Sequence, residues 1–478
     1  MSTSMNDHDQ RRTGAGQTLQ GTGRPAVQPP EGHLPWGQRP EPGPRAPRTL
    51  WAGAPDAEAG PLPVERPRAD DDSELATRDR APRVRLHGLD VARALALVGM
   101  VAVHVMPAYD EARGEETLVN SLFAGNAAAL FALLAGITLT LLSGGREPAT
   151  GRRMRRMRVS LLVRALLLIL IGLALNVLDF PAFNILPYYG VMFLMALPLV
   201  RLGRVPLFLL SGLFGVVGPL LRYLVFYLGA VEAGVNPTLV DLAQDPGGTF
   251  LMLGVTGVYP AITWMSYVCL GMALGRSRLD SPQFQSQVAL GGAGAVLLAT
   301  IVSWILLNPL GGISVIQTLT PGMDDEGWAE ALIFGATGET TASTLMWQAV
   351  AAPHLETIVS TLRAAGIAAG VLGVVMVTHR ALGRSLGTFV AALGSMTLTL
   401  YTAHLLFLLL PAWEDWRVLF WLIQVVVFTL FAVVWRRRVR QGPIETVVST
   451  ISKQAGRLLV PVRAESHHEG RRTTMRDR

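Results

Sequence analysis

The sequence has very little cysteine, lysine or aromatic character. Its 478 residues include one cysteine, and only 7% are Phe, Trp or Tyr. A single cysteine excludes disulfides within the chain and any cysteine-rich zinc site. Because Cys269 lies in an apolar segment, we expect it to be a packed core thiol. Lys453 is the only lysine among 41 basic residues, which indicates a coding bias rather than a functional choice.

Familiar catalytic signatures are absent as well. The sequence has no GxSxG nucleophile elbow, no Walker phosphate loop, no HExxH zinc motif and no GxGxxG after a strand. His104 is followed by an acid at Asp110, one position too far for the His–Asp arrangement of soluble glycerolipid acyltransferases. Hydrolase, ATPase and metalloprotease functions therefore have no support, and no metal site is predicted.

Long apolar runs dominate what the sequence does contain. Half of the residues are hydrophobic and the mean hydropathy is +0.38, values typical of a polytopic membrane protein with polar tails. We predict an all-α fold, a polytopic transmembrane bundle of about ten helices with disordered cytoplasmic tails. The predicted helices span residues 88–108, 121–143, 159–178, 185–201, 205–228, 251–275, 286–309, 356–378, 385–411 and 416–435.

The two ends of the chain differ from its middle. Residues 1–82 are rich in Pro, Gly and Arg and lack apolar periodicity, which predicts a disordered cytoplasmic tail. They also lack the apolar core of a cleavable signal peptide, so we expect the first helix to be an uncleaved signal anchor. Residues 83–450 form the predicted transmembrane domain, and residues 451–478 a basic cytoplasmic tail.

Arginine placement predicts the orientation in the membrane, because positively charged short loops stay in the cytoplasm. The net charge of +6 therefore reflects topology, and we discount nucleic-acid binding. Arginines cluster between 78 and 85, 146 and 158, 201 and 204, 276 and 278, 380 and 384, and 436 and 440, whereas the alternate loops carry acids. We expect a multi-pass protein of the inner or plasma membrane, with the lipid bilayer as partner and both termini cytoplasmic.

The first predicted helix contains polar residues that need an explanation. Residues 83–109, RVRLHGLDVARALALVGMVAVHVMPAY, combine a membrane-length apolar run with Asp90, Arg93 and His104. Charged groups at that depth are costly unless they are paired. Arg93 and His104 are eleven residues apart, so they share one helix face about 16 Å apart along the axis.

Each of these residues has a structural and a functional interpretation. His104 is either a helix-end imidazole bound to a neighbouring carbonyl or a general base. Arg93 pairs with Asp90 or holds an anionic donor such as the phosphates of a coenzyme, and the two roles are compatible. His354 and His404 fall at the same predicted depth as His104.

Other positions carry weaker signals. Asn126 is either an interhelical hydrogen bond or a site residue, and packing is the better interpretation. Pro260 predicts a kink in the sixth helix, and Tyr259 and Trp264 have the character of interfacial aromatics. The small residues expected to allow close helix contact are Gly136, Gly172 and Gly190, and Glu445 is expected to cap a short helix.

The stretch LDVARALALVGMVAVH at 89–104 resembles the first-helix signature of the transmembrane acyltransferase superfamily, which includes the acyltransferase-3 proteins and heparan-alpha-glucosaminide N-acetyltransferase. Together with further matches that cover nearly all of residues 83–450, it looks most like the bacterial membrane proteins of domain-of-unknown-function family 418, which resemble heparan-alpha-glucosaminide N-acetyltransferase. The further matches are ALFALLAG at 129–136, ILPYYGVMFLMALPL at 185–199, TGVYP at 256–260, APH at 352–354, LGSMTLTLYTAH at 393–404 and GPIE at 442–445.

This resemblance implies an enzyme that transfers an acyl group, with acetyl-CoA the expected donor, from the cytoplasm to an extracytoplasmic sugar or envelope glycan. It implies His104 as the catalytic base, with Arg93 as a catalytic and donor-side residue and Asp90 beside it. The residues expected to bind the acceptor are Asn126, His354, Tyr401 and His404.

Two other functions remain open from the sequence. A multi-helix transporter or flippase would use the same polar residues to line a path without covalent chemistry. No repeat between the two halves and no pair of plainly broken helices is evident, which disfavours it. A degenerate family member serving as a membrane scaffold is the third possibility.

Overall fold

The computed structural model describes residues 87–229, 234, 236–379, 384–411 and 413–461. The predicted disordered tail at 1–82 and residues 462–478 lie outside the described part. Within it the chain is helical apart from one short hairpin, which pairs β1 (Tyr109–Asp110) with β2 (Glu115–Glu116). The prediction of an all-α membrane protein is therefore confirmed in outline.

Seven described helices are long and apolar enough to cross a membrane, or eight if one bent pair is a single span. They are α2 (His87–Val105), α3 with α4 (Leu118–Phe123 and Asn126–Leu142), α5 (Gly151–Asn176), α7 (Arg204–Tyr227), α11 (Pro282–Leu307), α15 (Ile358–Thr378) and α18 (Arg417–Arg436), which follows a short turn at 414–416. The count of ten stays a prediction.

The three remaining predicted segments are helical but shorter or divided. Helix α6 covers only Leu186–Leu199. The sixth segment begins with α9 (Pro246–Leu251) and η1 (Met252–Thr256) and continues as α10 (Ala261–Gly275). The two parts are bent by 52° relative to each other, with Pro260 at the break. The ninth is divided into α16 (Arg384–Leu393) and α17 (Thr397–Phe407). The kink at Pro260 is confirmed.

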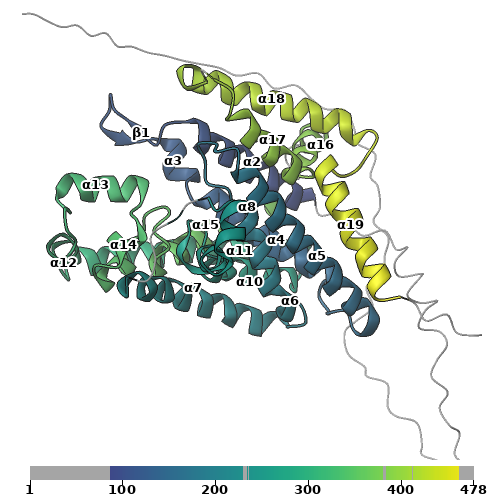
Figure 1. The fold of residues 1–478 in the computed structure, drawn as a ribbon, viewed down its shortest axis with the longest axis horizontal. Helices are drawn as coiled ribbons and strands as arrows, with labels where there is room; N and C mark the ends of the chain where they lie inside the picture. Colours follow the sequence, from purple (N-terminus) through teal and green to yellow (C-terminus); the bar gives the residue numbers. More distant parts are fainter. Residues whose placement is uncertain (1–86, 230–233, 235, 380–383, 412, 462–478) are drawn as a thin grey trace, which may run out of the picture. The chain divides into compact units, whose positions relative to one another are not determined.

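Helix α2 lies at the centre of the described bundle. It packs against α4, α15, α16, α17 and α18 (Figure 1). Within the most apolar 18-residue stretch of each helix, 72% of α2 is buried, compared with 17% of α7 and 17% of α18. Peripheral helices therefore present apolar side chains outward, as lipid contact requires, while α2 is enclosed by protein on most sides.

Close helix contact depends on small residues, as predicted. Gly136 of α4 faces the backbone of α10, and a Cβ at that position would collide with the carbonyl oxygen of Val268. Gly172 of α5 and Gly190 of α6 meet the opposite helix in the same way. Cys269, also on α10, is buried as expected. These contacts bring the backbones near the site into a fixed arrangement.

An asparagine network fixes the connection between α5 and α6. Asn184 Nδ2 donates to Asn176 Oδ1 at 2.7 Å, and its Oδ1 accepts from the Leu186 amide at 3.0 Å. Asn236 accepts from the Asn184 amide at 2.9 Å and donates to the Ala182 carbonyl at 2.8 Å. The buried backbone of this connection is thereby hydrogen-bonded, which leaves it little freedom to move.

Between α11 and α15 the chain forms a small helical cap that the sequence analysis did not predict. It contains α12 (Gly312–Leu319), α13 (Asp325–Phe334), α14 (Gly338–Thr341) and η2 (Leu345–Ala349). These elements enclose an apolar cluster of their own around Trp347, whose indole donates to Thr320 at 3.2 Å. The cap ends in the segment that carries His354.

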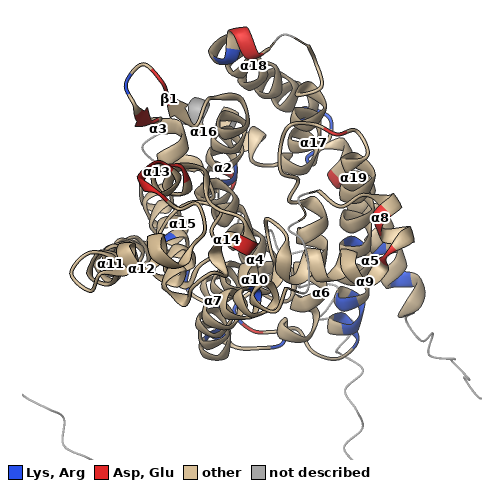
Figure 2. Ribbon diagram, turned by 60° about the vertical axis from the view of Figure 1, so that its left-hand side comes forward, with Lys and Arg blue, Asp and Glu red and all other residues tan. Residues whose placement is uncertain are grey.

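The C-terminal part of the fold extends past residue 450. Helix α19 (Pro443–Leu459) packs along α5, and Arg156 of α5 donates to the Val460 carbonyl at 2.8 Å. Figure 2 shows acidic residues near β1, α13 and the start of α18, and a group of basic residues on α5.

The packing at Gly136 gives a stability test with a matched control. We expect Gly136→Ala to lower the free energy of unfolding by about 1–3 kcal/mol, because the new methyl group collides with backbone. Gly212→Ala, in α7 with open space around it, should be neutral or slightly stabilising. Thermal unfolding in detergent measures both variants. Equal melting temperatures would contradict the proposed contact.

Candidate active site

Three polar side chains form a hydrogen-bonded chain through the bundle. His104, near the end of α2, lies with Nδ1 3.0 Å from Nε2 of His404 on α17. Nδ1 of His404 lies 2.8 Å from Oε1 of Gln424 on α18. The two imidazole rings stack with centroids 5.2 Å apart. His404 and Gln424 are fully buried, so the chain fixes the orientation of His104.

The chemistry of these three side chains determines which group donates and which accepts in each hydrogen bond. A carbonyl oxygen only accepts, so His404 donates from Nδ1 to Gln424 and keeps a lone pair on Nε2. His404 Nε2 then accepts from His104 Nδ1–H. This assignment leaves Nε2 of His104 as the proton acceptor, which is the form a general base needs.

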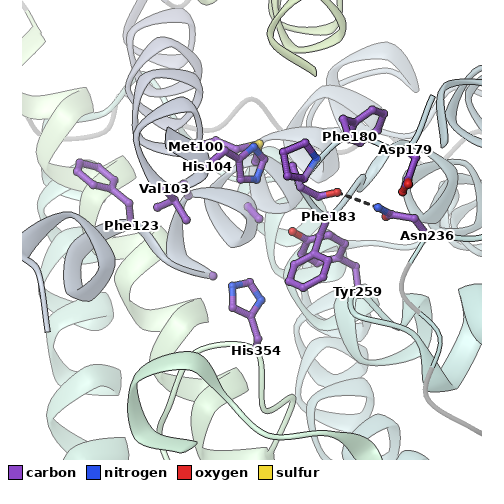
Figure 3. A pocket seen from close by; sticks show the side chains of 15 residues that line it. Met100, Val103, His104, Phe123, Asp179, Phe180, Phe183, Asn236, Tyr259 and His354 are labelled. Carbon is purple, nitrogen blue, oxygen red and sulfur yellow. Dashed lines mark hydrogen bonds between the residues drawn. The ribbon is translucent and has the colours of Figure 1, made fainter. Parts of the chain in front are cut away.

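The His104 ring lines a cavity of about 430 Å³, which we call the histidine cavity. Figure 3 shows His104 and His354 entering it from different elements, with Phe183 and Tyr259 beside them. Asn236 also lines it, where its amide holds the Ala182 carbonyl. The cavity thus combines an oriented imidazole with apolar walls and a few polar groups, the usual composition of a small-molecule site.

His354 is held in a strained backbone conformation. Its φ is +56°, and Glu356 also has φ +56°. Positive φ is costly for residues other than glycine and is concentrated at functional sites. Nδ1 of His354 is buried and makes no hydrogen bond within the described part of the chain. The strain is the local cost of directing this imidazole into the histidine cavity.

Glu356 anchors the strained segment. Its Oε2 accepts from Trp264 Nε1 at 2.9 Å. Burial raises the pKa of Glu356 to about 7, and the charge of Arg222 and the Trp264 hydrogen bond limit the rise. Burial lowers the pKa of His354 to about 4, so its ring is neutral at pH 7. A neutral imidazole whose Nδ1 has no partner among the described residues is suited to hydrogen bonding with a polar group of a ligand.

Tyr259 and Trp264 were expected at the membrane interface, and the structure corrects this. Tyr259 is 4% exposed and Trp264 is 2% exposed. Their rings contact edge to face with centroids 5.0 Å apart. The break at Pro260 places Tyr259 in the cavity wall. Breaks and π-helical turns such as η1 (Met252–Thr256) are frequent at functional sites.

A second cavity of about 470 Å³, which we call the arginine cavity, lies around Arg93, toward the start of α2. Arg93 forms an ion pair with Asp90 at 2.9 Å and donates to Thr138 on α4 at 2.6 Å. All three residues line the cavity, so the predicted pair exists and still faces open space. Pairing lowers the cost of placing these charges inside the bundle.

Two more arginines line the arginine cavity. Arg164 of α5 lies 5.9 Å from the ring centroid of Phe193, and its buried Nε makes no hydrogen bond within the described residues. Arg440 follows α18 and is exposed. Glu445 also lines the cavity and accepts from the amides of Leu398 and Thr399. Glu445 therefore caps α17, and not the short cytoplasmic helix after the last span that the sequence predicted.

The structure brings three of the predicted site residues together, namely His104, His354 and His404, and places the others elsewhere. His104 and His354 line the histidine cavity, and His404 lies behind His104 instead of lining a described cavity. Tyr401 lines the arginine cavity, where its hydroxyl holds the α5–α6 connection. Asn126 lines neither of these two cavities but a small separate cavity of about 30 Å³ with His354 and Glu356. Its amide donates to the Leu122 carbonyl at 3.1 Å, four residues back in the same membrane span, and not to another span.

Several residues around these cavities were not predicted from the sequence. Gln424 lies in an unbroken apolar segment, and a lone amide at that depth was the available signal. Arg164 lies inside the predicted span 159–178, where a charge at that depth was the available signal. Asn236 lies in a loop, where polar residues are common and therefore give no signal of a site. Among the described residues, no group of three or more His, Cys, Asp or Glu side chains is arranged to hold a metal ion.

Residues 85–305 match the family model described as "Heparan-alpha-glucosaminide N-acetyltransferase, catalytic". The match covers a little under half of the chain, including Asp90, Arg93 and His104. It confirms the resemblance to heparan-alpha-glucosaminide N-acetyltransferase over that segment. His354, His404 and Gln424 lie beyond the matched residues. A comparison with curated proteins found no match.

The strain at His354 predicts an unusual order of stabilities. We expect His354→Gly to be more stable than His354→Ala by about 1 kcal/mol, because both remove the ring but only glycine accepts positive φ freely. Chemical denaturation in detergent compares the two variants. If the alanine variant is equally or more stable, the backbone at residue 354 is not strained.

Proposed function

We propose that this protein is an integral-membrane acyltransferase that moves an acetyl group from cytoplasmic acetyl-CoA to an extracytoplasmic sugar or envelope glycan. The observation that carries the proposal is the pair of cavities on α2, with Arg93 in one and His104 in the other. The match to the catalytic family model over residues 85–305 supports the same activity.

The arginine cavity suits an anionic donor. Arg93, Arg164 and Arg440 line it, while Asp90 and Glu445 are engaged in the bonds described above. The buried, unbonded Nε of Arg164 is a donor that a phosphate or carbonyl oxygen of the ligand would satisfy. The residues present therefore fit the phosphate-rich end and the thioester of acetyl-CoA.

The histidine cavity supplies the base for the transfer. His104 Nε2 takes the proton from the hydroxyl or amine of the acceptor, and the freed electron pair forms the bond to the thioester carbonyl carbon. The carbon–sulfur bond breaks, and the proton passes from His104 to the departing thiolate. His404 and Gln424 hold the imidazole through this cycle, and the neutral His354 is positioned to bind the acceptor.

The proposal includes an orientation and a location. The arginine cavity faces the cytoplasm and the histidine cavity faces the outside, as the arginine distribution in the sequence predicts. Both termini are cytoplasmic, the membrane is the inner or plasma membrane, and the catalytic domain comprises residues 83–450 with helix α19 continuing beyond it.

Two variants should separate donor binding from chemistry. We expect His104→Ala to abolish transfer of labelled acetyl while leaving the Kd for acetyl-CoA within about twofold, because the ring touches only the histidine cavity. Arg164→Leu should weaken acetyl-CoA binding about tenfold or more. Calorimetric titration and a transfer assay on purified, folded protein measure both effects. Transfer of labelled acetyl by His104→Ala at the rate of the parent protein would contradict the mechanism.

Gln424 gives a test of the hydrogen-bonded chain. We expect Gln424→Leu to lower kcat about tenfold to a hundredfold at unchanged KM for acetyl-CoA, because His404 loses its acceptor and His104 its fixed orientation. Gln424→Glu keeps an acceptor, so it should recover transfer and shift the acidic limb of the pH profile. A Gln424→Leu variant with the parental transfer rate and pH profile would contradict the proposed role of the hydrogen bonds that join His104, His404 and Gln424.

Transport without covalent chemistry is the second candidate. The broken sixth segment and the two cavities on α2 favour it, because discontinuous helices line the sites of many transporters. A folded protein that binds no acyl-CoA and carries a solute across liposomes would establish this alternative.

A further inference from the structure

The histidine and arginine cavities are separate but share a lining residue on α2, and we call the boundary between them the partition. Among the described residues, Met100 is the one that lines both cavities. It follows Arg93 by seven residues and precedes His104 by four, spacings that return to the same helix face. Met100 is 6% exposed, so it is enclosed at a position between Arg93 and His104 along α2.

The α5–α6 connection forms the opposite side of the partition. Phe183 lines the histidine cavity and Ile185 lines the arginine cavity. The Tyr401 hydroxyl donates to the Phe183 carbonyl at 3.3 Å and accepts from the Ile185 amide at 3.4 Å. Asn184, between them, is held by Asn176 at 2.7 Å. This side is therefore fixed by hydrogen bonds, whereas Met100 is an unbranched, adaptable thioether.

We propose that Met100 is the movable part of this partition and that its side chain restricts the transferred group to a short acyl chain. The inference rests on the proposed acyltransferase function. His104 lies about 6 Å along the helix axis from Met100. An acyl group held by a donor in the arginine cavity must therefore displace the thioether to reach the imidazole. Because the facing wall is fixed, each additional carbon of the acyl chain competes with the Met100 side chain for the same space.

The size of residue 100 should set the preference for chain length. Met100→Ala is expected to raise hexanoyl transfer relative to acetyl transfer about tenfold or more, since methylene-sized changes in a pocket discriminate by about that factor. Met100→Phe should suppress acetyl transfer by a larger factor than it weakens acetyl-CoA binding. Met100→Leu, of similar volume, and Val103→Ala, which changes only the histidine cavity, are the controls.

The transfer assay uses purified full-length protein with acetyl-, butyryl- and hexanoyl-CoA. The inference is overturned if the chain-length preference of Met100→Ala stays within about twofold of the parent. It is also overturned if folded Met100→Phe transfers acetyl at the parental rate.

The partition itself has a readout that needs no activity. A Cys269→Ser background removes the single native thiol, and Ala127→Cys introduces one in the wall of the histidine cavity. With Met100 present, a small membrane-impermeant thiol reagent should react from one side of sealed vesicles, and with Met100→Ala from both. Equal reaction from both sides with Met100 present would overturn the partition. Sided labelling without acyl transfer by any variant would overturn the chain-length inference together with the proposed function.

Discussion

The arrangement of this protein depends on the cost of placing ionisable side chains inside a membrane bundle. Helix α2 carries three of them, and each has a partner. Arg93 bonds Asp90 and Thr138, which ties α2 to α4. His104 bonds His404, which is backed by Gln424 and ties α2 to α17 and α18. The same bonds that reduce the cost of burial hold the neighbouring helices around α2 and fix the direction of each functional side chain.

The two cavities follow from this arrangement. Arg93 and His104 are half-buried, with polar partners on one side and open space on the other, so each marks a separate cavity on the same helix. Breaks in the helices provide the remaining wall groups: the turn at Pro260 supplies Tyr259, and the strained segment before α15 supplies His354. A permanent cation and an oriented imidazole, in two cavities that share Met100, are the parts that the proposed acyl transfer would use.

The sequence alone predicted the central helix well, because a regular α-helix converts spacing into geometry. The eleven-residue interval between Arg93 and His104, the ion pair with Asp90 and the kink at Pro260 all follow from local rules. Partners from distant segments did not follow. His404 and Gln424 are twenty residues apart on different helices, and His104 precedes His404 by three hundred, so only the packed bundle shows their contact. The α12–α14 cap was missed because short helices around a small cluster lack the long apolar runs that identify membrane spans.

The most direct test of the account is the sidedness of transfer in sealed proteoliposomes of known protein orientation. Labelled acetyl-CoA is supplied to the face that bears the arginine cavity, and a sugar acceptor is placed on the face that bears the histidine cavity. We expect labelled acetyl-sugar to form with donor and acceptor on opposite sides, and free coenzyme A to remain on the donor side. Product formed only with both substrates on the same side, or passage of intact acetyl-CoA or unmodified sugar through the membrane without transfer, would contradict it.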